Sequence, residues 1–262
     1  MKKILALVMA ALLICLTFAG CGAGDKTDKE YVLDKGVLVV GITDFEPMDY
    51  KESEDATDWI GFDADMAKLF AEKLGVEVEF VEIDWDNKAL ELDSKTIDCV
   101  WNGMTLREDV LAAMDCSQPY CNNAQVVIVP AADADKYKTA EDCKDLQFAV
   151  EAGSAGEDMA EENGFKFTPV KDQATTLTEV KSGTCDAAII DSLMAGAMVG
   201  EGTGFADLTY TVGLNSEEYG VGFRKGSDLV AELNAFFDEC LENGKMMEIA
   251  AEYGVQAAII TK

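Results

Sequence analysis

The sequence lacks histidine altogether, and it has only two arginines and four prolines among its 262 residues. Without histidine, the Ser-His-Asp and Cys-His arrangements of nucleophilic catalysis, a His-ligated zinc site and an imidazole pH switch are all excluded. Basic residues are scarce as well, since 21 lysines and arginines face 50 acidic residues and the formal net charge is −29. Such a charge repels phosphate backbones, so nucleic acid is not an expected partner. The two arginines, Arg107 and Arg224, limit the possible bidentate clamps on a carboxylate.

An apolar run of membrane-spanning length is also missing. Two N-terminal lysines precede an apolar run over residues 4–18, which is shorter than the ~20 residues that a span needs. Small residues then stand directly before Cys21, and this ending resembles the lipobox of bacterial lipoproteins, whose cysteine carries the lipid. The resemblance implies a signal peptide over residues 1–20, a lipid on Cys21 and a tether over residues 21–30. It places the protein at the outer face of the cytoplasmic membrane, at the cell surface or in the periplasm. An ordinary secretory signal with a chance cysteine is the alternative.

Six further cysteines follow Cys21, and their spacing fixes no disulfide connectivity. Cys116 and Cys121 are close in sequence and form the most plausible pair. Cys99 and Cys185 lie in apolar, strand-like runs, where a free buried thiol is the expectation. A metal site built from cysteine alone would need paired close spacings, which are absent. We therefore expect neither a metal nor a cofactor.

Strand-like apolar runs alternate with helical runs along the remaining chain, in two similar cycles. The run over residues 62–74 is the clearest helix, because Met66, Leu69, Phe70 and Leu74 share one face. The alternation predicts an α/β protein with mainly parallel sheets and two lobes. In open sheets of this kind, ligands bind beyond the carboxyl ends of the strands. Three turns occupy such positions: residues 43–48, 101–107 and 151–156.

Seven short stretches form a recognisable pattern over most of the chain. They are Ile60–Asp65, Asp84–Asp86, Ile97–Thr105, Ser117–Tyr120, Glu151–Ser154, Cys185–Asp191 and Tyr219–Gly226. Taken in this order, they resemble the family 3 extracellular solute-binding proteins, the amino-acid receptors of ABC importers. No single stretch is specific for this family, but all seven in the right order are.

The resemblance implies a two-lobed, type II periplasmic-binding-protein fold whose lobes are joined by two hinge strands. Lobe one would comprise residues 31–122 and 214–262, lobe two residues 126–209, with hinges near residues 123–126 and 208–213. It also implies a monomer that binds a free amino acid, or a related amine-bearing solute, in the cleft between the lobes. Hinge closure would trap the ligand, which the protein would deliver to a membrane permease and its ATPase.

Residue roles follow from the same resemblance. Asp191 would hold the ligand's α-ammonium, with the Gly103 carbonyl and the Thr105 hydroxyl beside it and Asn102 flanking them. Ser154 and Ala155, at a helix N-terminus, would meet the α-carboxylate, while Phe45 and Trp85 would sandwich the side chain. Simpler interpretations stay open: Asp191, Thr105 and Ser154 could be helix caps, and the two aromatic residues could belong to the core.

One position departs from the family pattern. The resemblance places a carboxylate-clamping arginine five residues after Thr105, but this chain has Val110 there. Either Arg107 or the helix N-terminus of lobe two replaces the clamp, or the ligand lacks a standard α-amino-acid head.

Two other classes of function remain as alternatives. A carboxylate-dependent enzyme on the same scaffold would have to use Asp44, Glu46 or Asp191, because no histidine is present. A surface interaction lipoprotein would bind no small molecule at all.

Overall fold

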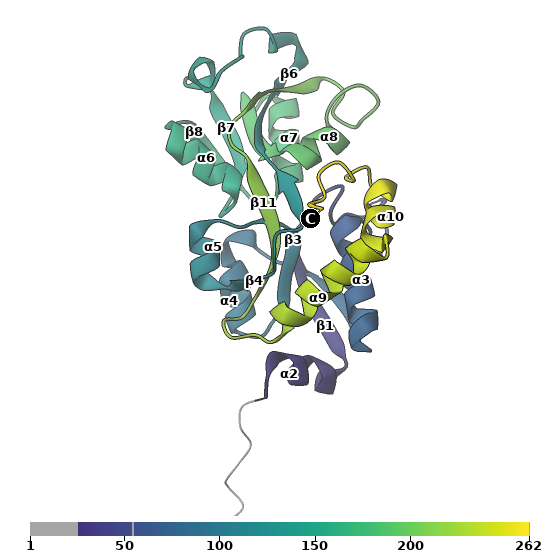
Figure 1. Cartoon of the computed structure of the whole chain (residues 1–262). Coiled ribbons are helices and arrows are strands. Elements are labelled where there is room, and N and C mark those ends of the chain that lie inside the picture. The colour runs from purple at the N-terminus through teal and green to yellow at the C-terminus, as the bar shows by residue number, and fades with distance from the viewer. Residues whose placement is uncertain (1–25, 54, 262) are drawn as a thin grey trace, which may run out of the picture.

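The structure, a computed structural model, describes residues 26–53 and 55–261. The expected signal peptide over residues 1–20 and the expected lipid site at Cys21 lie outside the described residues. No helix within the described ranges combines the length and the apolar character needed to cross a bilayer. The described chain forms two α/β lobes, which stand one above the other in Figure 1 and are joined by two short connections between strands.

Lobe one is built on a sheet with the strand order β2-β1-β3-β11-β4, in which β5 also pairs with β11. Strand β1 is parallel to β2 and β3, whereas β11 is antiparallel to β3. Five of the six β1 residues are buried, because this apolar strand has helices over both faces of its sheet. The strands are β1 (Val37–Ile42), β2 (Glu77–Glu82), β3 (Cys99–Thr105), β4 (Asp115–Cys116), β5 (Cys121–Asn123) and β11 (Glu217–Phe223).

Helices cover the two faces of this sheet (Figure 1). One face carries α3 (Phe62–Leu74), α9 (Leu229–Glu242) and α10 (Lys245–Glu252), and the other carries α4 (Lys88–Asp93) and α5 (Glu108–Ala113). The helix predicted over residues 62–74 is confirmed, and its buried Phe70 packs against Phe236 of α9 with ring centroids 5.4 Å apart. A short 3₁₀ helix, η1 (Trp85–Asn87), leads into α4.

Lobe two contains a sheet with the order β10-β6-β9-β7-β8. Strand β7 is parallel to β8 and β9, whereas β6 is antiparallel to β9 and β10. The strands are β6 (Gln125–Pro130), β7 (Gln147–Glu151), β8 (Lys166–Val170), β9 (Ala187–Asp191) and β10 (Leu208–Gly213). The helices are α6 (Ala155–Asn163), α7 (Gln173–Ser182) and α8 (Ser192–Met198), with 3₁₀ helices η2 (Ala131–Asp133) and η3 (Ala140–Cys143).

The chain passes between the two sheets twice. It crosses at residue 124, between β5 and β6, and returns at residues 214–216, between β10 and β11. The first crossing lies within the segment expected for a hinge, whereas residues 208–213 form β10 and pair with β6 inside lobe two. The predicted two-lobed α/β architecture is confirmed. The sheets are mixed rather than mainly parallel, because the strands next to the crossings run antiparallel to their neighbours.

The predicted Cys116–Cys121 disulfide is wrong, since both thiols are free, as are the other four cysteines of the described chain. Cys116 lies opposite Gly222 of β11, and Cys121 lies opposite Tyr219. Three residues of strand therefore separate them, or about 10 Å, and a disulfide needs Cα atoms within about 7 Å. Cys99 is a free buried thiol as expected, and burial raises its pKa well above the ordinary value.

Helix α2 (Asp28–Lys35) was not predicted, and it begins inside the segment expected to be a tether. Thr27 and Glu30 form a capping box, in which each side chain accepts a hydrogen bond from the other residue's backbone N–H at 3.2 Å. Residues 28–30 are therefore helical, and α2 lies at the lower end of lobe one in Figure 1.

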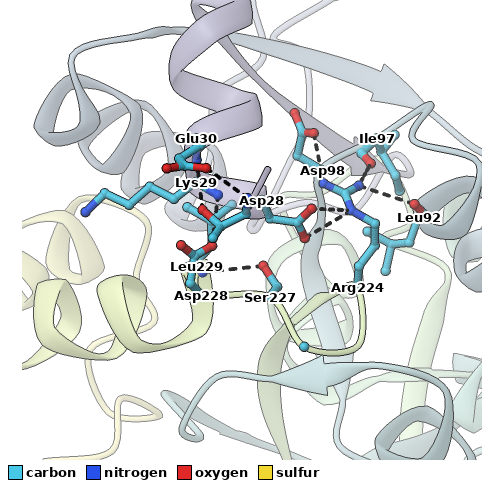
Figure 2. Close-up of polar contacts among 12 residues, drawn as sticks. Asp28, Lys29, Glu30, Leu92, Ile97, Asp98, Arg224, Ser227, Asp228 and Leu229 are labelled. Atoms are coloured by element: carbon cyan, nitrogen blue, oxygen red, sulfur yellow. Dashed lines mark hydrogen bonds and ion pairs between the residues drawn. The ribbon is translucent and has the colours of Figure 1, made fainter. Parts of the chain in front are cut away.

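Arg224 is buried directly after β11 and fastens α2 to lobe one (Figure 2). Its Nε lies 2.9 Å from Asp28 Oδ1, and its Nη2 lies 3.3 Å from Asp98 Oδ1. Its Nη1 donates to the carbonyls of Ile97 at 2.7 Å and Leu92 at 3.2 Å. The Arg224 guanidinium therefore makes its contacts with residues of lobe one and of α2.

Candidate ligand-binding site

A small cavity, lined by residues of both lobes, lies between them. Lobe one contributes the loop after β1, the η1–α4 segment and the end of β3. Lobe two contributes the β7–α6 turn, the start of α7 and the end of β9, so three strand ends meet here as expected for open α/β sheets. All nine residues that the sequence pointed to line this cavity: Phe45, Trp85, Asn102, Gly103, Thr105, Arg107, Ser154, Ala155 and Asp191. It is also lined by residues without a predicted role: Lys88, Met104, Val110, Glu151, Gly153 and Gln173.

Phe45 and Trp85 form an apolar wall of the cavity, and both side chains are buried. The Phe45 ring meets the Tyr219 ring edge-on, with centroids 6.3 Å apart. Gly103 has a φ of 54°, and a Cβ there would stand 2.5 Å from Phe45 Cε1. A larger residue at position 103 would therefore displace the ring as well as strain the backbone.

Asn102 holds the loop that carries Phe45. Its Oδ1 accepts from the Thr43 backbone N–H at 3.0 Å and from the Thr43 hydroxyl at 2.9 Å. Its Nδ2 donates to the Thr43 carbonyl at 2.9 Å and to Asp49 Oδ2 at 2.8 Å. Because both ends of the amide are occupied, Asn102 acts on the site by positioning this loop.

Asp191 ends β9 and is buried, with 3% of the residue exposed. Tyr219 Oη donates to Oδ1 at 2.7 Å and Gln125 Nε2 donates to it at 3.0 Å, while the Asn123 and Gln173 amides also donate to the carboxylate. Asp191 occupies the N-cap position of α8, but its side chain makes no capping hydrogen bond. The capping interpretation is therefore wrong for this side chain.

The pKa of Asp191 is raised to about 8, first by burial and then by the nearby Glu217 carboxylate. Its four side-chain donors are neutral groups, so no cation of the described residues pairs with the carboxylate. A cationic group entering the cavity would stabilise the ionised form of Asp191.

Glu217, at the start of β11, links Thr105 to the first crossing between the lobes. Its Oε1 accepts from Thr105 Oγ1 at 3.0 Å, from Asn123 Nδ2 at 2.7 Å and from Gln125 Nε2 at 2.8 Å. Thr105 is not a helix cap, because Arg107 occupies the N-cap position of α5. The Thr105 hydroxyl therefore belongs to the polar network that also holds Asp191.

Ser154 caps α6, as its alternative interpretation proposed. Its Oγ accepts from the Glu157 backbone N–H at 3.2 Å. The preceding Gly153 has a φ of 69°, and a Cβ there would stand 2.7 Å from the Asp86 Cα of lobe one. The backbone of the two lobes approaches closely at Gly153, which a larger residue would prevent.

Arg107 joins the lobes but has acidic partners on both sides. Its Nη2 lies 2.9 Å from Asp109 Oδ2 in lobe one, and its Nη1 lies 3.0 Å from Asp158 Oδ2 in lobe two, a contact too bent to be a hydrogen bond. Nη2 also donates to the Gly153 carbonyl at 3.3 Å. Val110, where the family pattern has an arginine, lines the cavity with a buried apolar side chain.

Lys88 and Glu151 are ionisable, buried residues of the cavity to which the sequence assigned no role. Lys88 Nζ donates to the Trp85 and Gly153 carbonyls, each at 3.0 Å, and burial lowers its pKa to about 8. Burial, followed by the charge of Asp191, raises the pKa of Glu151 to about 8, and its buried Oε1 has no hydrogen-bond partner. Two signals could have found them: Lys88 follows Trp85 by three residues, and Glu151 opens the predicted turn at 151–156.

The remaining acidic candidates do not line the cavity. Asp44 borders a neighbouring pocket together with Glu82 and Lys171, and Glu46 is absent from the lining of either pocket. No group of acidic or cysteine side chains within the described chain is arranged to hold a metal ion.

Comparison with known proteins gives concordant matches. The family of bacterial extracellular solute-binding proteins, family 3, matches residues 38–256. The arginine-binding extracellular protein ArtP of Bacillus subtilis (strain 168) is 30% identical over 262 residues, covering 97% of this chain and 98% of that protein. The L-cystine-binding protein TcyA of the same organism is 30% identical over 267 residues, covering 96% and 97%. The crystal structure of the P235GK mutant of ArgBP from T. maritima has a TM-score of 0.80 and 30% identity, covering 86% of this chain and 98% of that one.

Proposed function

Because the chain belongs to the bacterial extracellular solute-binding proteins of family 3, we propose that it is the substrate-binding component of an ABC importer. It binds a free amino acid, or a closely related amine-bearing solute, and delivers it to a membrane permease and its ATPase. The relatives named above bind arginine and cystine, so relatives of similar identity accept different side chains. The observation that carries the proposal is the buried Asp191 carboxylate at a cavity between two lobes, where the part of the chain that the structure describes offers it no cationic partner.

Asp191 receives the ligand's ammonium group in this proposal. The four donors around Asp191 are neutral, so the ligand's ammonium supplies the missing positive charge. The resulting hydrogen bond is charge-assisted. The Gly103 carbonyl and the Thr105 hydroxyl oxygen complete the ammonium site, since both residues line the cavity. Phe45 and Trp85 contact the ligand's side chain through the faces of their rings.

Closure of the lobes retains the ligand. The crossings at residue 124 and residues 214–216 are the segments at which one lobe can rotate on the other. A ligand that contacts Asp191 in lobe two and Phe45 in lobe one interacts with both lobes only in the closed form, and this differential affinity shifts the population toward closure.

A panel of amino acids tests the proposed function. At a concentration of 100 times its Kd, a ligand stabilises the folded state by about 2.7 kcal/mol. For a chain of this size that corresponds to a rise in Tm of roughly 5–10 °C. We expect one chemical class among the twenty amino acids, cystine and their amines to produce this rise in differential scanning fluorimetry of the chain without residues 1–20.

The same experiment separates the alternatives. A binding protein should return the ligand chemically unchanged after prolonged incubation, as measured by mass spectrometry of the small molecules released on denaturation. Conversion of the ligand would instead indicate an enzyme. If no member of the panel changes the Tm, the protein is better described as a surface interaction lipoprotein.

We also propose that Cys21 carries a lipid and anchors the protein, as a monomer, to the outer face of the cytoplasmic membrane. Intact-mass spectrometry of the full chain expressed in a bacterium should show loss of residues 1–20 and the added mass of a diacylglycerol group. The Cys21→Ser variant should lack this mass and leave the membrane fraction. Membrane retention of that variant would contradict the proposal.

A further inference from the structure

Lys88 is a buried cation that has no anionic partner within the described chain. Its side chain lines the cavity, yet only 7% of the residue is exposed. The ammonium contacts two carbonyls, one from each lobe, and the face of the Trp85 ring, whose centroid is 4.9 Å away. No carboxylate of the described residues lies within ion-pair distance of Nζ, in contrast to Arg107 with Asp109 and Asp158.

This arrangement leaves the ammonium incompletely satisfied. A lysine ammonium has three N–H donors, and the carbonyls of Trp85 and Gly153 occupy two of them. Burying a charge without an ion-pair partner in contact is costly. Burial, followed by the charge of Arg107, lowers the pKa of Lys88, and the more distant Glu151 carboxylate acts in the opposite direction. An anionic group in the cavity would supply both the missing acceptor and the missing charge.

The surroundings of Lys88 suit a carboxylate. Its Nζ is bonded to the carbonyl of Gly153, which immediately precedes the N-terminus of α6 at Ser154 and Ala155. The backbone N–H groups of a helix N-terminus favour anions. Lys88 and this helix N-terminus therefore border the same part of the cavity, and Val110 adds only an apolar surface.

We propose that Lys88, rather than Arg107, binds the α-carboxylate of the ligand, together with the N-terminus of α6. This inference rests on the proposed function and names the substrate class more narrowly: a zwitterionic α-amino acid with its ammonium at Asp191 and its carboxylate at Lys88. Arg107 serves a different purpose, because its contacts with Asp158 and Gly153 hold the two lobes together.

The test uses two ligands and four substitutions, two of Lys88 and two controls. The probes are the L-amino acid that binds best in the panel and the amine left by its decarboxylation, such as agmatine for arginine, histamine for histidine or cystamine for cystine. Isothermal titration calorimetry should show that Lys88→Met weakens binding of the amino acid by about 10- to 100-fold, the range of a hydrogen bond to a charged group. Binding of the decarboxylated amine should change less than about threefold. Lys88→Arg should restore most of the preference for the amino acid.

Two controls make the result specific. Arg107→Met removes the contact between the lobes and should weaken the binding of the amino acid and of its amine by the same factor. Lys166→Met, at an exposed position of lobe two, should change neither affinity. The assignment would be overturned if Lys88→Met lowered the affinities for both ligands equally. It would also be overturned if Arg107→Met, instead, lowered the affinity for the amino acid but not for its amine. Either outcome would leave the proposed amino-acid binding intact. If the wild-type chain binds no panel member, the proposed function fails and not merely the role of Lys88.

Discussion

Asparagine in place of Asp191 is expected to lower the affinity for the amino-acid ligand by at least about 30-fold, because removal of one partner of a buried charge pair costs about 2–5 kcal/mol or more. The substitution keeps the size of the side chain but removes the charge that the ligand's ammonium neutralises. The four neutral donors around the carboxylate cannot replace that interaction. The affinities of the wild-type and Asp191→Asn chains, measured by isothermal titration calorimetry, test this expectation.

A matched substitution excludes a general effect of lost charge. Asp145 is an exposed aspartate of the same lobe, and Asp145→Asn should leave the affinity unchanged. The Tm of each ligand-free variant reports whether the fold is intact. A folded Asp191→Asn protein that binds its amino acid within threefold of wild type would show that Asp191 does not hold the ammonium.

The sequence was most informative where local patterns coincide with tertiary structure. Helix α3 has the predicted bounds because Gly75 ends it clearly and its apolar residues face the core. The predicted turns at the ends of β3 and β7 also meet at one cavity, as the geometry of open α/β sheets requires.

Features that depend on contacts between distant residues were not predictable in this way. Helix α2 has weak amphipathic character, with Val32 as its buried residue, and it is held by a capping box and by Asp28, whose partner Arg224 lies 196 residues away. The Cys116–Cys121 expectation failed because closeness in sequence says nothing about where each cysteine pairs along β11.

The candidate site shows the same division. Residue types and order brought nine positions to one cavity, but they could not show which charges remain unbalanced there. Arg107 was the obvious replacement for the missing family arginine, yet the fold places Asp158 of the other lobe beside it. Lys88 was not among the predicted site residues. Its burial and its hydrogen bond to the Gly153 carbonyl depend on the closed arrangement of the two lobes.

Methionine in place of Arg224 is expected to lower the free energy of unfolding by about 3–5 kcal/mol, the usual cost of breaking a buried ion pair by removing one partner. The substitution removes the guanidinium that contacts both Asp28 and the buried Asp98 (Figure 2). Within the described chain, Asp98 then keeps Lys35 as its one cationic partner, at 2.6 Å. It also deprives the Leu92 and Ile97 carbonyls of a donor. Urea unfolding followed by circular dichroism measures the change.

The neighbouring Lys225 provides the control for this prediction, because it follows the same strand but its side chain is 49% exposed and pairs with Asp115 at the surface. Lys225→Met should therefore cost no more than about 1 kcal/mol, as is usual for exposed ion pairs. Arg224 does not line the cavity, so the folded Arg224→Met protein should bind its ligand within about threefold of wild type. An Arg224→Met loss no larger than that of Lys225→Met would contradict the structural role of Arg224, whereas a selective loss of ligand affinity would mean that this guanidinium acts at the binding site after all.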